Sequence, residues 1–362
     1  MRIRALTLRP FRNFKQIDLP FEEDHVLIFG PNGRGKSNIL EAISYLSIGK
    51  SVRGAKDQQA VPHGEEYFDI QAQCNNGRHE QKLRIFYAKT SGKKAFCEET
   101  LLPRVSDVLG LFKTVHFSPE DVSLVLRFPA QRRRLLDILI SQSSPQYLRD
   151  LQRYQRVLTQ RNHLLRSWRK GGRGSEEKDN LELWTSQLAQ LGGGLREKRL
   201  ESLEEMRGSF ASYYRRFAPK GEEAAIEYRG AELGGDRSQG EELLEKYRGR
   251  RDQELQVGYT LYGPHRDDLV FTLNSQPADT FGSEGQLKTI LIAWKMAEVR
   301  LLEEPEGRQP VLLLDDVFSE LDRQRVEDFL EIIDEFDQVL VTTPQEPGPT
   351  IGERFAEIRL PA

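Results

Sequence analysis

The chain has 362 residues, with 53 Lys and Arg against 56 Asp and Glu, which gives a formal net charge of −3 at pH 7. This length allows one large domain with an insertion or two domains, and 38% hydrophobic with 30% charged residues excludes a disordered or fibrous chain. No apolar stretch reaches the ~18 residues of a membrane span, and no signal peptide is visible. The two cysteines cannot form a disulfide framework. We therefore expect a cytoplasmic protein without membrane contact.

The first third of the chain predicts strands around one glycine-rich turn. Alternating residues at 3–7 and 17–21 predict two strands, and the apolar run 26–29 predicts a buried one. The spacing of apolar residues predicts a helix over 37–49. Strand alternation returns over 66–117, with glycine turns inside it.

Residues 130–217 are predicted to be helical. Apolar residues recur at steps of three and four in two stretches, 147–168 and 181–217. The polar segment 171–175 between them indicates a loop, so we expect a short antiparallel helical hairpin.

The last third alternates strands and helices. Expected strands are 224–228, 257–261, 268–273, 311–314 and 338–342, and expected helices are 239–255, 285–304 and 323–336.

A phosphate-binding loop is the most specific motif. The residues Gly30-Pro31-Asn32-Gly33-Arg34-Gly35-Lys36-Ser37, followed by Asn38, fit GxxxxGK[ST] between a buried strand and a helix. Backbone N–H groups and the helix N-terminus favour an anion there. We expect Lys36 to bind nucleotide phosphates and Ser37 to bind Mg²⁺.

Paired carboxylates follow the apolar run 311–314. A buried parallel strand delivers such residues to the sheet edge where ligands bind. We expect Asp315 to hold Mg²⁺ and Asp316 to orient or deprotonate the attacking water.

A second small-residue motif, 281–286, opens the helix predicted at 285–304. Since the chain already has one phosphate loop, this second anion site is useful when it serves the ATP of a neighbouring copy. The order of phosphate loop, SxGQ motif, apolar strand with Asp-Asp and the segment 319–322 is similar to the ATP-binding-cassette (ABC) superfamily.

Within that superfamily the chain most resembles the RecF family of bacterial recombination mediators, which is related to the chromosome-maintenance (SMC) ATPases. The blocks that carry the resemblance span nearly the whole chain and lie at 12–14, 117–122, 131–137, 263–269 and 313–322.

The resemblance implies an α/β fold: an ABC-type P-loop ATPase head with a mixed sheet, formed by 1–118 and 257–362, and an inserted helical arm domain, 119–256. It implies an ATP-dependent homodimer that acts in recombinational repair and replication restart. The dimer would bind single- and double-stranded DNA, work with RecR- and RecO-like partners to help load recombinase at gaps, and hydrolyse ATP slowly as a switch.

The resemblance also assigns residues. It implies that Arg12 touches nucleotide and that Ser283, Gly285 and Gln286 reach the γ-phosphate bound by the opposite protomer. Asp316 stands where many relatives have Glu, and its shorter reach suggests slow hydrolysis. Thr342-Thr343-Pro344 replaces the switch histidine of transporter cassettes.

The small net charge hides an uneven distribution. Between Arg127 and Arg173 there are twelve basic and two acidic residues, so this segment carries +10 and the remainder −13. A charged run is more often a solvated helix face, but arginine pairs well with phosphates. The candidate DNA contacts are Arg132, Arg133, Arg134, Arg153 and Arg156.

The motifs leave one alternative function, the nucleotide-binding subunit of an ABC transporter. That class shares the same three motifs, but 279 residues separate Lys36 from Asp315, which is more than a transporter cassette uses. A P-loop kinase needs no SxGQ motif, and an SMC head would need a longer coiled coil.

Overall fold

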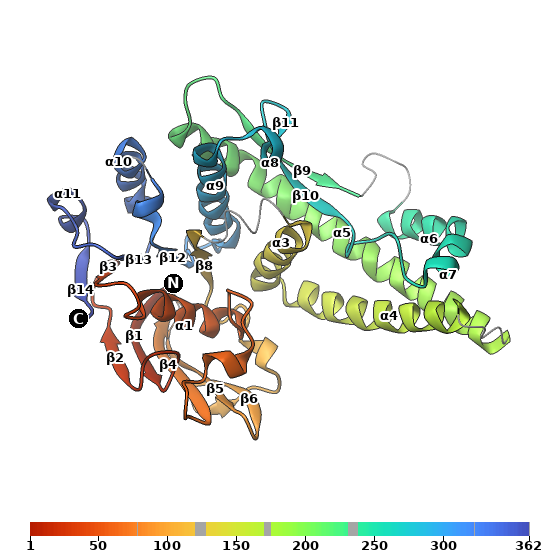
Figure 1. Cartoon of the computed structure of the whole chain (residues 1–362), viewed down its shortest axis with the longest axis horizontal. Helices are drawn as coiled ribbons and strands as arrows, with labels where there is room; N and C mark the ends of the chain where they lie inside the picture. The colour runs from red at the N-terminus through yellow and green to blue at the C-terminus, as the bar shows by residue number, and fades with distance from the viewer. Residues whose placement is uncertain (78, 120–127, 170–174, 231–237, 322, 362) are drawn as a thin grey trace. The chain divides into compact units, whose positions relative to one another are not determined.

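The computed structural model describes all residues except 78, 120–127, 170–174, 231–237, 322 and 362 (Figure 1). The chain divides into two compact units. The first, which we call the head, comprises Met1–Leu124, Ser209–Glu223 and Gly282–Ala362; the second, the arm, comprises Val125–Gly208 and Ala224–Phe281.

A five-stranded parallel sheet lies in the head, with the strand order β14-β3-β13-β12-β8. Its three central strands are apolar runs, as expected for parallel strands that are buried on both faces. The bounds are β3 His25–Phe29, β8 Thr114–Phe117, β12 Val311–Asp315, β13 Val339–Thr343 and β14 Ala356–Arg359. Because β3, β13 and β12 are adjacent and parallel, the loops after them meet at one edge.

The second sheet of the head is antiparallel and has the order β2-β1-β4-β5-β6-β7. Its residues alternate between buried and more exposed positions, since one face packs on the core. The bounds are β1 Arg2–Arg9, β2 Ile17–Pro20, β4 Tyr67–Asn75, β5 Glu80–Ala88, β6 Gly92–Cys97 and β7 Thr100–Leu101.

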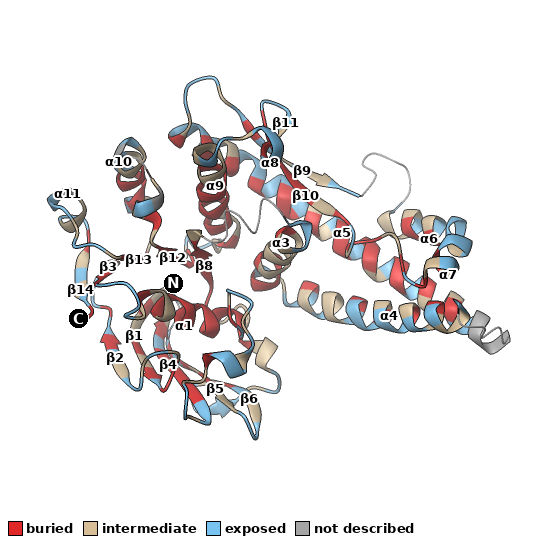
Figure 2. Ribbon diagram, viewed as in Figure 1, coloured by how far each residue is buried: buried red, intermediate tan, exposed pale blue. Residues whose placement is uncertain are grey.

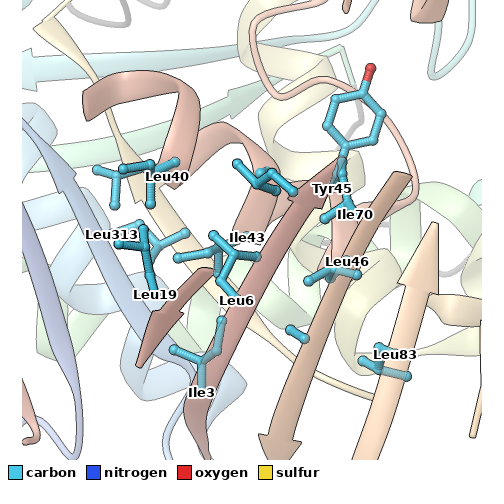
Figure 3. Close-up of a cluster of buried hydrophobic side chains, with 14 of the residues drawn as sticks. Ile3, Leu6, Leu19, Leu40, Ile43, Tyr45, Leu46, Ile70, Leu83 and Leu313 are labelled. Carbon is cyan, nitrogen blue, oxygen red and sulfur yellow. The ribbon is translucent and has the colours of Figure 1, made fainter. Parts of the chain in front are cut away.

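Helix α1, Lys36–Ile48, contacts strands of both sheets. It is buried along nearly its whole length, and Figure 3 shows its Leu40, Ile43 and Leu46 in one cluster with side chains of both sheets. A helix that is surrounded by core in this way holds its first turn rigidly. The other head elements are α9 Glu284–Leu302, α10 Arg323–Ile332, α11 Pro349–Gly352 and the 3-10 turns Asp57–Ala60, Val105–Val108, Val317–Glu320 and Ile333–Glu335.

The arm contains the predicted antiparallel hairpin. Helix α4, Pro145–Arg169, and helix α5, Ser175–Phe217, run side by side (Figure 1). Tyr147 near the start of α4 contacts Arg199 far along α5, whereas Arg161 contacts Thr185 near the start of α5, so the helices are antiparallel. The further elements are α3 Pro129–Ser143, β9 Ala224–Arg229, α6 Gln239–Gly249, α7 Arg251–Val257, β10 Asp268–Leu273, β11 Gln276–Pro277 and α8 Ala278–Phe281.

Two local predictions are wrong. No strand forms at 257–261, because the backbone N–H groups of Thr260 and Leu261 donate to the side chains of Asn162 and Glu254 instead of to a neighbouring strand. The single helix expected over 239–255 is two helices, α6 and α7, which are separated at Arg250 with ψ of 11°.

The division into units also differs from the expected domain boundaries. Residues 257–281 group with the arm, since β10 pairs with β9 along its whole length. Residues 209–223, the end of α5 and the turn after it, group with the head, where Tyr213 bonds Arg300 and Glu335.

No helix in the part of the chain that the structure describes is both long and apolar enough to cross a membrane.

Candidate functional site

The candidate site lies at the carboxyl ends of β3, β12 and β13. The loop after β3 carries the predicted phosphate motif, and three of its glycines have positive φ, namely 147° at Gly30, 80° at Gly33 and 98° at Gly35. At Gly35 an added Cβ would lie 2.4 Å from Asn13 Oδ1, so this position requires glycine for space as well as for conformation. The motif therefore forms the turn that its sequence predicts.

Lys36 folds back over this loop. Its Nζ donates to the carbonyl oxygens of Gly30 at 2.6 Å and Pro31 at 3.0 Å. Burial lowers the pKa of Lys36, and the carboxylates of Asp316 and Asp315 act in the opposite direction. The ammonium group thus lies inside the loop, close to two acidic side chains.

Asp315, the last residue of β12, connects the first turn of α1 to β13. Its Oδ1 accepts from Ser37 Oγ at 2.7 Å and from Thr342 Oγ1 at 2.6 Å, and its Oδ2 accepts from Arg53 at 3.1 Å. These residues line a cavity of about 210 Å³ together with Asn32, Gly33, Gly35, Lys36, Asn38, Asp316 and Pro344. The structure therefore brings together the motif and the Asp-Asp pair that are 279 residues apart in sequence.

A buried ion cluster lies behind this cavity. Glu41 on α1 is fully buried and accepts two hydrogen bonds from the guanidinium of Arg12, at 3.0 and 2.6 Å. Ser51 Oγ donates to the same carboxylate at 2.5 Å, and Arg53 lies 3.9 Å away. Arg12 does not line the cavity itself. The sequence prediction missed Glu41 and Arg53, and the one available signal was that Glu41 is the single acidic residue of α1.

Asp316 has a strained backbone, with φ of 49° in the left-handed region. Its N–H donates to the carbonyl oxygen of Thr342 at 3.1 Å and to the hydroxyl oxygen of the same residue at 3.0 Å. Ser319 Oγ donates to Asp316 Oδ1. The side chain lines the cavity but already has a partner on one oxygen.

His116 is a buried residue near Asp315. Neither ring nitrogen has a hydrogen-bond partner among the described residues. Burial lowers its pKa to about 4, and Asp315 opposes this shift. The imidazole is therefore neutral near pH 7.

The predicted second anion motif lies at the start of α9. Ser283 Oγ accepts from the N–H of Gln286, and the Gln286 side chain accepts from the N–H of Ser283, which together form a capping box. Gln286 also donates to Glu222, and an added Cβ on Gly285 would lie 3.3 Å from the Arg325 guanidinium. None of Ser283, Gly285 and Gln286 lines the cavity at Lys36.

The candidate DNA contacts in the arm differ sharply in exposure. Arg132 is buried and forms a bidentate pair with Asp268, so its guanidinium is already occupied. Arg133 donates to the Asp267 carbonyl, and burial lowers its pKa. Arg134 is half-buried, whereas Arg153 and Arg156 are exposed. Three basic residues of the counted segment lie outside the described residues, namely Arg127, Lys170 and Arg173. The same holds for 120–122 and Asp322, which belong to the blocks that carry the family resemblance.

Comparison with known proteins identifies the family. The family model "RecF/RecN/SMC N terminal domain" matches residues 2–359. The DNA replication and repair protein RecF of Moorella thermoacetica is 40% identical over 95% of this chain and 90% of its own length. The chain belongs to the RecF family. RecF of Heliobacterium modesticaldum is 39% identical, over 95% of this chain and 92% of that one.

Solved structures confirm the predicted fold class and the resemblance of this RecF-family chain. The recombination mediator protein RecF with ATP, in the RecFOR pathway, matches with a TM-score of 0.88 and 33% identity, over 95% of this chain and 92% of the other. An SMC head bound to the C-terminal winged-helix domain of ScpA matches with a TM-score of 0.55 and 16% identity, over 99% and 94% of the two chains, and shows the shared fold only.

Proposed function

We propose that this RecF-family chain is an ATP-dependent DNA-binding protein of DNA replication and recombinational repair. The observation that carries the proposal is the convergence of Lys36, Ser37 and Asp315 on one cavity. The RecF structure with ATP and the names of the relatives support it.

ATP would bind with its phosphates in the loop 30–38. The backbone N–H groups and the first turn of α1 would cradle the β-phosphate, and Lys36 would exchange its bonds to Gly30 and Pro31 for bonds to phosphate oxygens. Arg53 lines the same cavity and is a further cation for the nucleotide. Arg12 would act at the edge of the site.

The site fits Mg²⁺ because its donors are oxygens. Ser37 Oγ and Asp315 Oδ1 lie 2.7 Å apart, so one ion could contact both, and Mg²⁺ in nucleotide sites commonly takes few protein ligands. The ion would neutralise charge on the phosphates. Asp316 would position the attacking water, and its bond from Ser319 and its short side chain favour slow hydrolysis.

A second copy of the chain would complete each site. Ser283, Gly285 and Gln286 present a helix N-terminus that does not line this chain's own cavity, so we propose that they contact the γ-phosphate held by the partner in an ATP-dependent homodimer. ATP would then close two heads on DNA, and RecR- and RecO-like proteins would be the partners in loading recombinase.

We expect Ser283→Arg to block ATP-dependent dimerisation while nucleotide binding changes less than about threefold. A bulky cation at the motif would prevent the close approach of two protomers, whereas the loop 30–38 would be untouched. Sedimentation with and without ATP measures the first property and a nucleotide titration the second. Ser283→Thr keeps the helix cap and serves as the control. Dimers of Ser283→Arg with ATP would contradict this interface.

The proposed function is tested by DNA retention with and without ATP. We expect ATP to increase retention of both single- and double-stranded DNA, and log affinity to fall with log salt at about −0.9 per phosphate contact on duplex. A chain that retains no DNA in either state would overturn the proposal and favour an ABC transporter subunit.

A further inference from the structure

A groove on the arm lies between α4 and α5. It has a volume of about 1000 Å³, which is at the upper end of the ~300–1,000 Å³ of cavities that hold ligands. Both helices contribute lining residues, and several of those on α4 are exposed. Figure 2 shows exposed positions along α4. The lining residues are Ser144, Gln146, Tyr147, Asp150, Arg153, Arg156, Val157, Gln160, Trp184, Gln187, Gln190, Leu191, Gly194, Leu195 and Lys198.

The charges in this groove favour an anionic occupant. Arg153, Arg156 and Lys198 are the lining cations, and Asp150 is the one lining carboxylate. Asp150 already accepts from Gln146 at 2.7 Å and lies 3.7 Å from Arg153. The lining therefore has a net charge of +2, on a chain whose overall charge is negative. Lys198 also lies 3.1 Å from Glu201 outside the groove, so Arg156 is the lining cation that forms no ion pair with a described residue.

Several polar groups in the groove are available to a ligand. Arg156, Gln160, Gln187, Gln190 and the Trp184 indole make no hydrogen bond or ion pair with another described residue. Glutamine side chains offer both donors and acceptors, and an indole offers a flat face. Amide groups can form hydrogen bonds with base edges, an aromatic ring can stack on a base face, and cations can bind phosphates. Together these groups suit a nucleotide strand.

Gly194 supplies a separate argument. Three consecutive glycines occur inside α5, and two of them are explained by packing, since an added Cβ would lie 2.9 Å from Leu243 at Gly192 and 2.4 Å from Gly240 at Gly193. At Gly194 an added Cβ would meet nothing within 4 Å, although the residue lines the groove. Glycine inside a helix is unfavourable relative to alanine, and at Gly194 the missing side chain leaves the groove open to the close approach of a ligand.

We propose that the groove between α4 and α5 binds an unpaired DNA strand, with phosphates at Arg153, Arg156 and Lys198 and a base against Trp184. The proposal rests on the DNA-binding function above and adds where a single strand would lie. A duplex keeps its base faces stacked inside, so it could offer only phosphates to the rim, whereas an unpaired strand can place bases on an aromatic side chain.

The test uses the full chain, a short labelled oligothymidylate and the matching duplex. We expect Trp184→Leu to weaken oligothymidylate binding about tenfold, and Arg156→Gln to reduce the salt slope by about 0.7. Gly194→Leu would fill the groove and weaken binding similarly, although leucine is the better helix former, so misfolding does not explain its loss. Arg166→Gln, an exposed residue on α4 outside the groove, is the control and should bind like the parent.

The outcomes separate the two proposals. Equal oligothymidylate affinity of the parent and the three groove variants would overturn the groove assignment and leave the DNA-binding function standing. Groove variants that bind oligothymidylate normally but lose a protein partner would make the groove a protein site and would also overturn the assignment. A parent chain that binds no DNA would overturn the proposed function itself.

Discussion

Lys36→Ala should lower the affinity for ATP by about a hundredfold or more. Its ammonium group can make charge-assisted hydrogen bonds to phosphate, and each bond of this kind contributes about 1.5–3 kcal/mol. Arg53, the other cation among the described residues that line the cavity, would replace it only in part, because its guanidinium already contacts Asp315 and lies near Glu41. Titration with a fluorescent ATP analogue measures the loss directly.

The Lys36 prediction has a matched control and a weaker companion. Lys82 on β5 is exposed, and Lys82→Ala removes the same charge from the head away from the cavity, so ATP affinity should stay unchanged. Lys36→Arg keeps the charge but adds bulk in a confined loop, and we expect it to weaken ATP-dependent dimerisation. Parent-like ATP affinity of Lys36→Ala would show that the nucleotide binds elsewhere.

The central part of this site could be predicted because its determinants are local. The turn from Gly30 to Ser37 depends on neighbouring residues, and apolar runs before Lys36 and Asp315 identify parallel strands. Parallel strands end at one edge, so Ser37 and Asp315 were expected near each other without knowledge of the strand order. The structure places the two side chains 2.7 Å apart, while their role as Mg²⁺ ligands stays a prediction.

The ion cluster behind the site could not be predicted in the same way. Glu41 contacts Arg12, Ser51 and Arg53 because two separate segments of the head, one at Arg12 and one at 51–53, pack against α1. No periodicity in the sequence encodes those contacts. The pattern at 257–261 misled for a related reason, since side chains from α4 and α7 satisfy backbone groups that a strand would otherwise pair.

The same limit applies to the basic segment. Counting charges gives +10 over 47 residues, but the count does not distinguish exposed arginines from buried ones. Arg132 and Arg161 lie inside the arm and pair with Asp268 and Glu254, which come from distant parts of the chain. Of the five candidate DNA contacts, Arg153 and Arg156 are the exposed ones, and they stay predictions. The positive charge is thus partly an internal feature of the arm's packing.

Arg161→Met should destabilise the arm by about 3–5 kcal/mol, the usual cost of removing one partner from a buried ion pair. The guanidinium is 1% exposed and donates to Glu254 at 2.6 Å, Thr185 at 2.9 Å and Thr260 at 2.8 Å. Without it the Glu254 carboxylate, which is fully buried, would keep from the described part of the chain only the bond from the Leu261 N–H at 2.8 Å. A charge left in this state is the main source of the cost.

Hydrogen exchange is the suitable measurement, because a chain with two compact units need not unfold in one step. Amide protection should fall in α4 and α7 and stay unchanged in α9 of the head. Arg166→Met, an exposed change on the same helix, should alter stability by less than ~0.5 kcal/mol. The double variant Arg161→Met with Glu254→Leu should recover much of the loss, since an apolar pair leaves no buried charge. Unchanged protection in Arg161→Met would mean that Glu254 gains water or another cation, and that this ion pair does not hold the hairpin to α7.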